Sequence, residues 1–189
     1  MSGIIGEGGK SGIIGAGSKE GWILLETETA SNAGSPNIGS ATTISSTYDD
    51  YMIVGSSIRL HTAGNMLFKM TIGGALKTDA YKTVTDGIDS YGTRSTSYHS
   101  DSSYGFITGS LSANNNTYDV LDFKMYLTSP TSTVYRHKVW GIGAYTTSSG
   151  YITNRTFSAR HDNTGALTKI TFGGSGNMTG TFKLYGLTK

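Results

Sequence analysis

The sequence predicts an all-β domain, folded as a β-sandwich or a β-barrel, on the basis of three observations. Short runs of β-branched, aromatic and aliphatic residues recur along the chain, and some of them alternate strictly with polar residues. Turn-forming residues separate these runs at nearly regular spacing. No stretch of ten residues keeps a helical period through its glycine and β-branched content. The 189 residues suit one domain, which we expect to occupy residues 21–189.

Three strands are expected in the first half of this body. Residues 22–25 read Trp-Ile-Leu-Leu and open the first strand, and the Tyr-Met-Ile-Val of residues 51–54 begins the second, which continues to residue 60. Residues 65–72 form the third. The segment 80–104 is rich in Ser, Thr, Tyr and Asp, so we expect long loops or short edge strands there, with a turn at Asp86-Gly87.

The second half contains the clearest alternation, in residues 120–127. One face of this run carries the apolar side chains Leu121, Phe123, Met125 and Leu127. Residues 134–145 form a longer run that contains Gly141 and Gly143, and such glycines indicate a bulge or a close approach of backbones. Residues 151–159 alternate again. Residues 167–172 and 181–187 are expected to pair and to end the domain.

Residues 1–20 differ in composition from the body. The sequence Ser-Gly-Ile-Ile-Gly of residues 2–6 returns at residues 11–15. So many glycines prevent independent folding, but a flexible linker would lack the isoleucine pairs. We therefore expect an extended anchoring arm that inserts its isoleucines into apolar pockets of another subunit; the alternative is a terminus with incidental isoleucines. The anchoring residues would be Ile4, Ile5, Ile13 and Ile14.

Composition excludes several classes of protein. The absence of cysteine excludes a disulfide scaffold and a thiolate metal site. No apolar run approaches the roughly 20 residues that span a bilayer, so we expect no membrane insertion. The net charge of +2 does not predict binding to nucleic acid, which favours clustered Lys and Arg.

The sequence shows no motif of a catalytic or cofactor site. The four histidines are scattered without short spacing, and they are His61, His99, His137 and His161. Asp49-Asp50 predicts a turn before a strand, and Asp122 is expected to be a solvated side chain. A glycosidase needs two carboxylates at a set separation, and no such pair stands out. We therefore expect no catalytic residue, no metal, no cofactor and no enzymatic activity.

Tyrosines mark the Ser/Thr-rich middle of the chain as a possible recognition surface. The tyrosine ring packs against a partner while its hydroxyl stays hydrated, which suits contacts with sugars or proteins. The alternative is that tyrosine is frequent there because it favours β-strands. The candidate residues are Tyr81, Tyr91, Tyr98 and Tyr104.

Both ends of the chain resemble a known family. Residues 167–172 with the Gly-Thr-Phe-Lys-Leu-Tyr-Gly of residues 180–186 resemble the last hairpin of small jelly-roll virion proteins of tailed bacteriophages. The repeat in residues 1–20 is similar to the amino-terminal anchors of phage structural proteins, including those of marine and cyanobacterial phages, and residues 47–54 are similar to an early strand of the same group. The resemblance implies a jelly roll, a symmetric oligomer such as a homotrimer, and no catalytic residue.

Two functions from different classes follow from these observations. The first is a structural protein of the virion, assembled in the host cytoplasm, that decorates or cements a capsid or forms a short fibre and contacts other virion proteins through residues 1–20. The second is a receptor- or carbohydrate-binding tip that contacts a host surface glycan. A polysaccharide-degrading enzyme is disfavoured by the missing acid pair.

Overall fold

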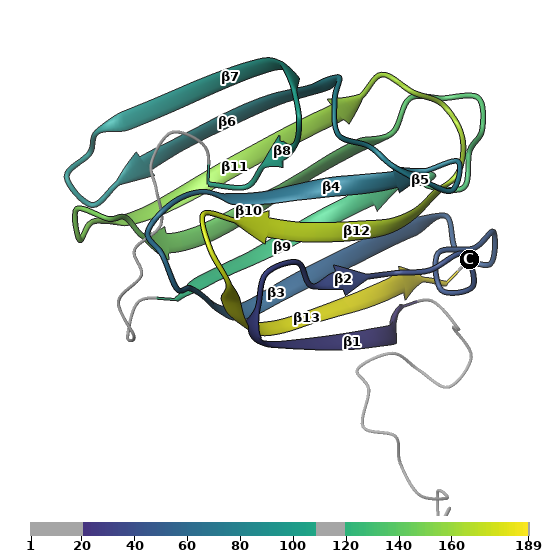
Figure 1. The fold of residues 1–189 in the computed structure, drawn as a ribbon, viewed down its shortest axis with the longest axis horizontal. Coiled ribbons are helices and arrows are strands. Elements are labelled where there is room, and N and C mark those ends of the chain that lie inside the picture. Colours follow the sequence, from purple (N-terminus) through teal and green to yellow (C-terminus); the bar gives the residue numbers. More distant parts are fainter. Residues whose placement is uncertain (1–20, 109–119, 189) are drawn as a thin grey trace, which may run out of the picture.

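The computed structural model describes residues 21–108 and 120–188 (Figure 1). These residues form two antiparallel sheets packed face to face, which confirms the expected all-β sandwich. In Figure 1 the smaller sheet lies in front of the larger one. The expected arm, with Ile4, Ile5, Ile13 and Ile14, lies outside the described residues. In the described part of the chain there is no helix long and apolar enough to cross a membrane.

Eight strands form the larger sheet and five belong to the smaller one. The larger sheet has the order β1 (Trp22–Ala33), β13 (Met178–Leu187), β3 (Asp50–Leu60), β9 (Leu121–Thr128), β10 (Lys138–Thr146), β11 (Ile152–His161), β6 (Tyr81–Asp89) and β7 (Arg94–Ser102). The smaller sheet has the order β2 (Asn37–Ile38), β12 (Leu167–Gly174), β4 (Met66–Ile72) and β5 (Ala75–Leu76), and β8 (Gly105–Phe106) also pairs with β4.

The strand pairing is that of a jelly roll with added strands. β1 pairs with β13, β2 with β12, β3 with β9 and β4 with β8, as if one long hairpin had been rolled up. The pairs β13–β3 and β12–β4 then join this ribbon into two sheets, which is the double-sheet jelly-roll arrangement. Strands β10, β11, β6 and β7 extend the larger sheet beyond β9. The expected jelly-roll-like sandwich is therefore confirmed.

Three local expectations were wrong. Residues 80–104 were expected to form long loops or short edge strands, but they contain β6 and β7, each nine residues long; β7 does lie at the edge of the sheet, whereas β6 lies inside it between β11 and β7. Asp86-Gly87 lies within β6 and not in a turn. The last two strands do not pair with each other, because β12 belongs to the smaller sheet and β13 to the larger one.

The core lies between the two sheets and is dominated by aromatic and aliphatic side chains. Phe172 of β12 stacks on Phe182 of β13, with ring centroids 4.5 Å apart, and Phe123 of β9 lies 5.5 Å from Phe172. All three are at most 3% exposed. These rings join the two sheets, because each sheet supplies at least one of them.

Four inward-facing glycines make room for aromatic rings. A Cβ on any of them would come within 2.1–2.6 Å of a ring atom, which is closer than real side chains approach. The rings therefore lie directly against the backbone of a strand. The four pairs are Gly55 with Phe123, Gly105 with Phe68, Gly141 with Phe157, and Gly186 with Tyr48.

Candidate functional site

The outer face of the larger sheet, which points away from the smaller sheet, is unusually apolar for a solvated surface. Several of its large hydrophobic side chains are between 39% and 67% exposed, while others, such as Met52 and Tyr126, are half-buried. Antiparallel sheets commonly leave one face in water, but that face then carries mainly polar residues. Extended exposed apolar patches mark contact surfaces. The exposed members are Trp22, Leu24, Val84, Ile88, Tyr98, Trp140 and Ile142.

One register row, which we call the aromatic row, crosses this face from edge to edge. It takes one residue from each of the eight strands, and seven of these residues are apolar or aromatic. Tyr126 stacks on Trp140 with ring centroids 4.4 Å apart, and Trp22 reaches the other side of Tyr126 at 6.3 Å. In sheet order the row is Leu24, Tyr185, Met52, Tyr126, Trp140, Ser158, Val84 and Tyr98.

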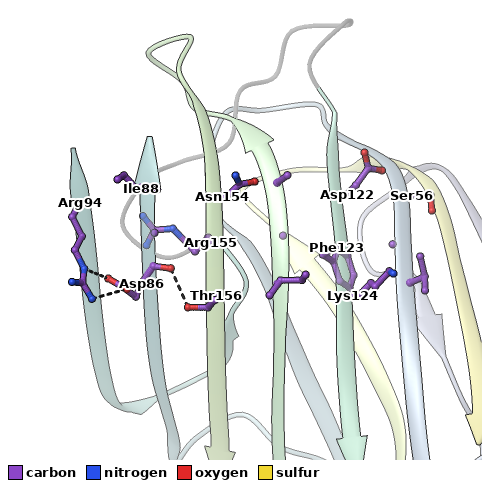
Figure 2. Close-up of a pocket in the computed structure, with 16 residues that line it drawn as sticks. Ser56, Asp86, Ile88, Arg94, Asp122, Phe123, Lys124, Asn154, Arg155 and Thr156 are labelled. Atoms are coloured by element: carbon purple, nitrogen blue, oxygen red, sulfur yellow. Dashed lines mark hydrogen bonds and ion pairs between the residues drawn. The ribbon is translucent and has the colours of Figure 1, made fainter. Parts of the chain in front are cut away.

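A hollow of about 730 Å³ lies beside the aromatic row, two residues farther along the strands. Figure 2 shows that its lining side chains come from neighbouring strands of the larger sheet. Val54, Ile142 and Ala144 supply apolar surface, while Asn154 and Thr156 of β11 supply an amide and a hydroxyl. The volume lies within the range of ligand pockets, and the mixture of an apolar floor with a few polar groups is typical of them.

An ion pair closes the hollow at its β6–β7 side. Arg94 donates through Nε and Nη2 to the two carboxylate oxygens of Asp86, both at 2.9 Å, and Thr96 donates to the same carboxylate at 2.7 Å (Figure 2). These bonds from Arg94 and Thr96, helped by the charges of Arg94 and Arg155, lower the pKa of Asp86 to about 2. Asp86 is therefore a fixed anion in the neutral range and is not suited to donate a proton.

Replacing Arg94 by Met is expected to raise the pKa of Asp86 towards 3.8, because the largest stabilisation of the carboxylate is removed. In the wild type the ionised carboxylate favours the fold at pH above 3.8, and this contribution is lost as the pH falls through about 2. The pKa is measured from the carboxyl ¹³C shift during an NMR titration. Lys169→Met on the smaller sheet is the control, and an unchanged Asp86 pKa in Arg94→Met would contradict the assignment.

A group of four cations, which we call the basic row, lies on the opposite side of the aromatic row. Lys138, Arg160 and Lys82 are direct neighbours on β10, β11 and β6, and Arg136 precedes β10. Asp162 forms ion pairs with Lys82 at 3.0 Å, Arg160 at 3.0 Å and Arg136 at 3.6 Å. The hydrogen bond from Lys82, aided by the charges of Lys82, Arg160 and Arg136, lowers the pKa of Asp162. Asp162 thus pairs with three of the four cations, and these five side chains together keep a positive excess.

Arg155 lies behind the hollow, on the inner face of β11. It is 1% exposed and donates through Nη1 to Thr85 Oγ1 at 2.9 Å, while its Nε and Nη2 have no hydrogen-bond partner among the described residues. Gly87 on the neighbouring strand β6 leaves room for the Arg155 side chain, because a Cβ at residue 87 would lie 3.1 Å from Arg155 Nε. Burial raises the pKa of nearby Tyr145 to about 12, and the charge of Arg155 limits this rise.

The structure does not gather the four tyrosines that the sequence suggested for recognition. The prediction is wrong for Tyr81, which is fully buried and whose hydroxyl accepts a hydrogen bond from the Met70 amide at 2.6 Å. Tyr98 is 67% exposed and ends the aromatic row. Tyr91 lies in the turn between β6 and β7, and Tyr104 lies on the other side, at a hollow of about 230 Å³ beside the smaller sheet.

The carboxylates of the main hollow do not form a glycosidase pair. Asp86 on β6 and Asp122 on β9 are separated by two intervening strands, so their strands lie about 14 Å apart. Retaining and inverting glycosidases place their carboxyl groups about 5–9.5 Å apart. Asp122 Oδ1 instead accepts a hydrogen bond from the Ser57 amide at 2.6 Å. Over residues 21–108 and 120–188 no group of three His, Asp or Glu side chains is placed to hold a metal ion.

The sequence did not predict that the residues of this surface lie together. The alternation of residues 120–127 placed Lys124 and Tyr126 on the polar face of their strand, which the structure confirms. Nothing local to the sequence indicates that Trp140 stacks on Tyr126 or that Lys82 lies beside Arg160. Those neighbours depend on the order of strands in the sheet, which is a property of the whole chain.

The arrangement is therefore a broad, open surface with an aromatic centre, a hollow on one side and a basic row on the other. No protein-family model matches the chain, and no curated protein or solved structure is significantly similar to it.

Proposed function

We propose that this chain is a non-enzymatic structural protein of a tailed-phage virion, which decorates or stabilises the capsid or the tail. The observation that carries the proposal is the outer face, where a partly exposed aromatic row crosses all eight strands. A face of this kind equips the jelly roll to contact another molecule. The resemblance of residues 167–187 and of residues 1–20 to phage structural proteins supports the virion as the place of that contact.

In this proposal residues 1–20 attach the body to other virion proteins, and the body acts as a symmetric oligomer, expected to be a homotrimer. Ordering such a segment on docking costs conformational entropy at that moment. Several arms on one oligomer offset the cost, because after the first arm docks the others bind at a high effective concentration. Ile4, Ile5, Ile13 and Ile14 are the proposed anchoring side chains.

Deleting residues 1–20 is expected to leave a folded oligomer that no longer joins the particle. The body keeps its core, since both sheets lie within the described residues. Incorporation is measured by immunoblotting of purified particles, and light scattering is expected to give three times the mass of one chain for the truncated and the full-length protein. Replacing the four isoleucines by Ser is the finer variant. Normal incorporation of the truncated protein would refute the anchoring arm.

A second candidate function, recognition of a host-surface glycan, is favoured by one specific observation. The hollow beside the aromatic row combines an apolar floor with the amide of Asn154 and the hydroxyl of Thr156. Sugars present the same combination, since their C–H faces are apolar and their hydroxyl groups form hydrogen bonds. A virion protein with this function would display the outer face towards the host.

A further inference from the structure

We propose that the outer face binds an acidic polysaccharide, which lies along strands β10 and β11 and places a sugar ring on Trp140 and a carboxylate on the basic row. The proposal rests on the second candidate function and names its ligand class. Its support is the sequence of chemical groups along these two strands, which changes from cationic to aromatic to polar within one continuous track.

The track follows the register of the β10–β11 pair. Lys138 lies opposite Arg160, Trp140 opposite Ser158, and Ile142 opposite Thr156. Ala144 and Asn154 form the next step, inside the hollow. From residue 138 to residue 144 a strand advances about 20 Å, so the track accommodates several sugar units in an extended chain.

Trp140 is placed to receive a sugar ring. Tyr126 stacks on one side of the indole, and the residue on the opposite side is Ser158, the smallest side chain of the aromatic row. Beyond Ser158 the row continues with the larger side chains of Val84 and Tyr98, which are 45% and 67% exposed. The indole is 51% exposed and already fixed by Tyr126, so little side-chain entropy is lost when a ligand packs against it.

The basic row supplies the charge complementarity that selects an acidic ligand. Arg160 and Lys82 share the single carboxylate of Asp162 with Arg136, and Lys138 forms no ion pair with a described residue. The excess cations lie directly beside Trp140 and Ser158 on the same strands. A guanidinium that binds a sugar carboxylate through two hydrogen bonds fixes its position as well as its charge.

The same charges disfavour one arrangement of a second copy on the face. In a two-fold contact whose axis runs along the strands, the basic rows of the two copies would lie against each other and juxtapose like charges. Burying cations that lack a partner is costly. Single-stranded nucleic acid, which also combines anionic groups with rings that stack on aromatic side chains, is the competing ligand and is therefore included in the test.

The test is a binding titration of the full-length protein with polygalacturonate, alginate and polysialic acid, with fully methyl-esterified pectin as the uncharged match for polygalacturonate. We expect at least one of the three acidic polymers to bind, with an affinity that falls as salt is added. If polygalacturonate binds, the methyl-esterified pectin is expected to bind at least about tenfold more weakly. Trp140→Ala and Lys138→Glu are each expected to weaken binding by about tenfold or more. Lys169→Glu, on the smaller sheet, is the control and should bind as the wild type does.

Several results would overturn the proposal. The first is that none of the three acidic polymers binds. The second is that Trp140→Ala and Lys138→Glu, at an unchanged melting temperature, bind the polymer as tightly as the wild type does. The third is that single-stranded DNA displaces the polymer at concentrations lower than that of the polymer. A fall of Trp140→Ala to the mass of one chain would show that a second copy occupies the face. Particle incorporation of the variants is scored separately, so failure of glycan binding and failure of the virion assignment are distinguishable.

Discussion

Replacing Phe172 by Ala is expected to destabilise the protein by about 3–5 kcal/mol, which is the cost of truncating a fully buried Phe and leaving a cavity. Phe172 belongs to the smaller sheet, is 1% exposed, and packs against Phe182 and Phe123 of the larger sheet. The substitution therefore removes the principal aromatic contact between the sheets. The free energy of unfolding is measured by urea titration followed by circular dichroism.

Two control variants make this measurement decisive. Phe172→Leu keeps most of the volume and is expected to cost less than about 1.5 kcal/mol. Tyr135→Ala removes a ring that is 72% exposed and is expected to change stability by less than about 0.5 kcal/mol. A loss of less than about 1 kcal/mol in Phe172→Ala would mean that the sheets are not joined through these rings.

The strands that the sequence predicted best are those with strict alternation. Residues 120–127 alternate between apolar and polar side chains, and in β9 the residues at the apolar positions are buried while most of those between them are exposed. A period of two in a half-buried strand depends only on the local pattern of burial. The fold class and most strands were therefore predictable without knowledge of the strand order.

β6 was missed because its buried face lacks the usual hydrophobic residues. Between Tyr81 and Gly87 the inward positions are Thr83 and Thr85, each fully buried although polar. Thr85 accepts the hydrogen bond from Arg155, which is itself buried. A strand that buries hydroxyl groups against a guanidinium is mistaken for a polar loop when strands are predicted only from the alternation of hydrophobic residues.

The error in the last two strands has a different cause. The local pattern of β12 and β13 shows which residues point inward, but not which sheet each strand joins. Phe172 and Phe182 do meet, yet they meet face to face across the core instead of side by side in one sheet. Two strands that are consecutive in sequence often pair, and the jelly roll is an arrangement in which these two do not.

The candidate site was less predictable than the fold, because it is assembled from every strand of one sheet. The aromatic row joins residues as distant in sequence as Leu24 and Tyr185, which pair directly. The sequence placed Tyr126 and Tyr185 on strands, but nothing in it indicated that these strands carry the two tyrosines in one row. The arm, in contrast, was inferred from a contiguous repeat and needs no knowledge of the strand order.

Gly141 illustrates how a single strand position controls this assembly, and Gly141→Ala is expected to destabilise the protein by about 1–3 kcal/mol. A Cβ at residue 141 would lie 2.1 Å from the Lys124 carbonyl oxygen and 2.5 Å from the Phe157 ring. The carbonyl belongs to the backbone of β9, so it cannot move aside as a flexible side chain would. β10 pairs with β9 and β11 without a register shift, so this glycine marks a close approach and not a bulge.

The consequence extends to the outer face, because Gly141 is flanked by Trp140 and Ile142. Displacing β10 from β9 would separate Trp140 from Tyr126, and the expected result is a weakened indole–phenol stack together with the loss of stability. Gly173→Ala is the matched control: its Cβ would meet nothing within 4 Å and its φ is not positive, so the substitution is expected to be neutral or to stabilise by about 0.4–1 kcal/mol. Thermal unfolding and tryptophan fluorescence measure both effects, and equal stability of the two variants would show that β10 tolerates the extra methyl group without moving.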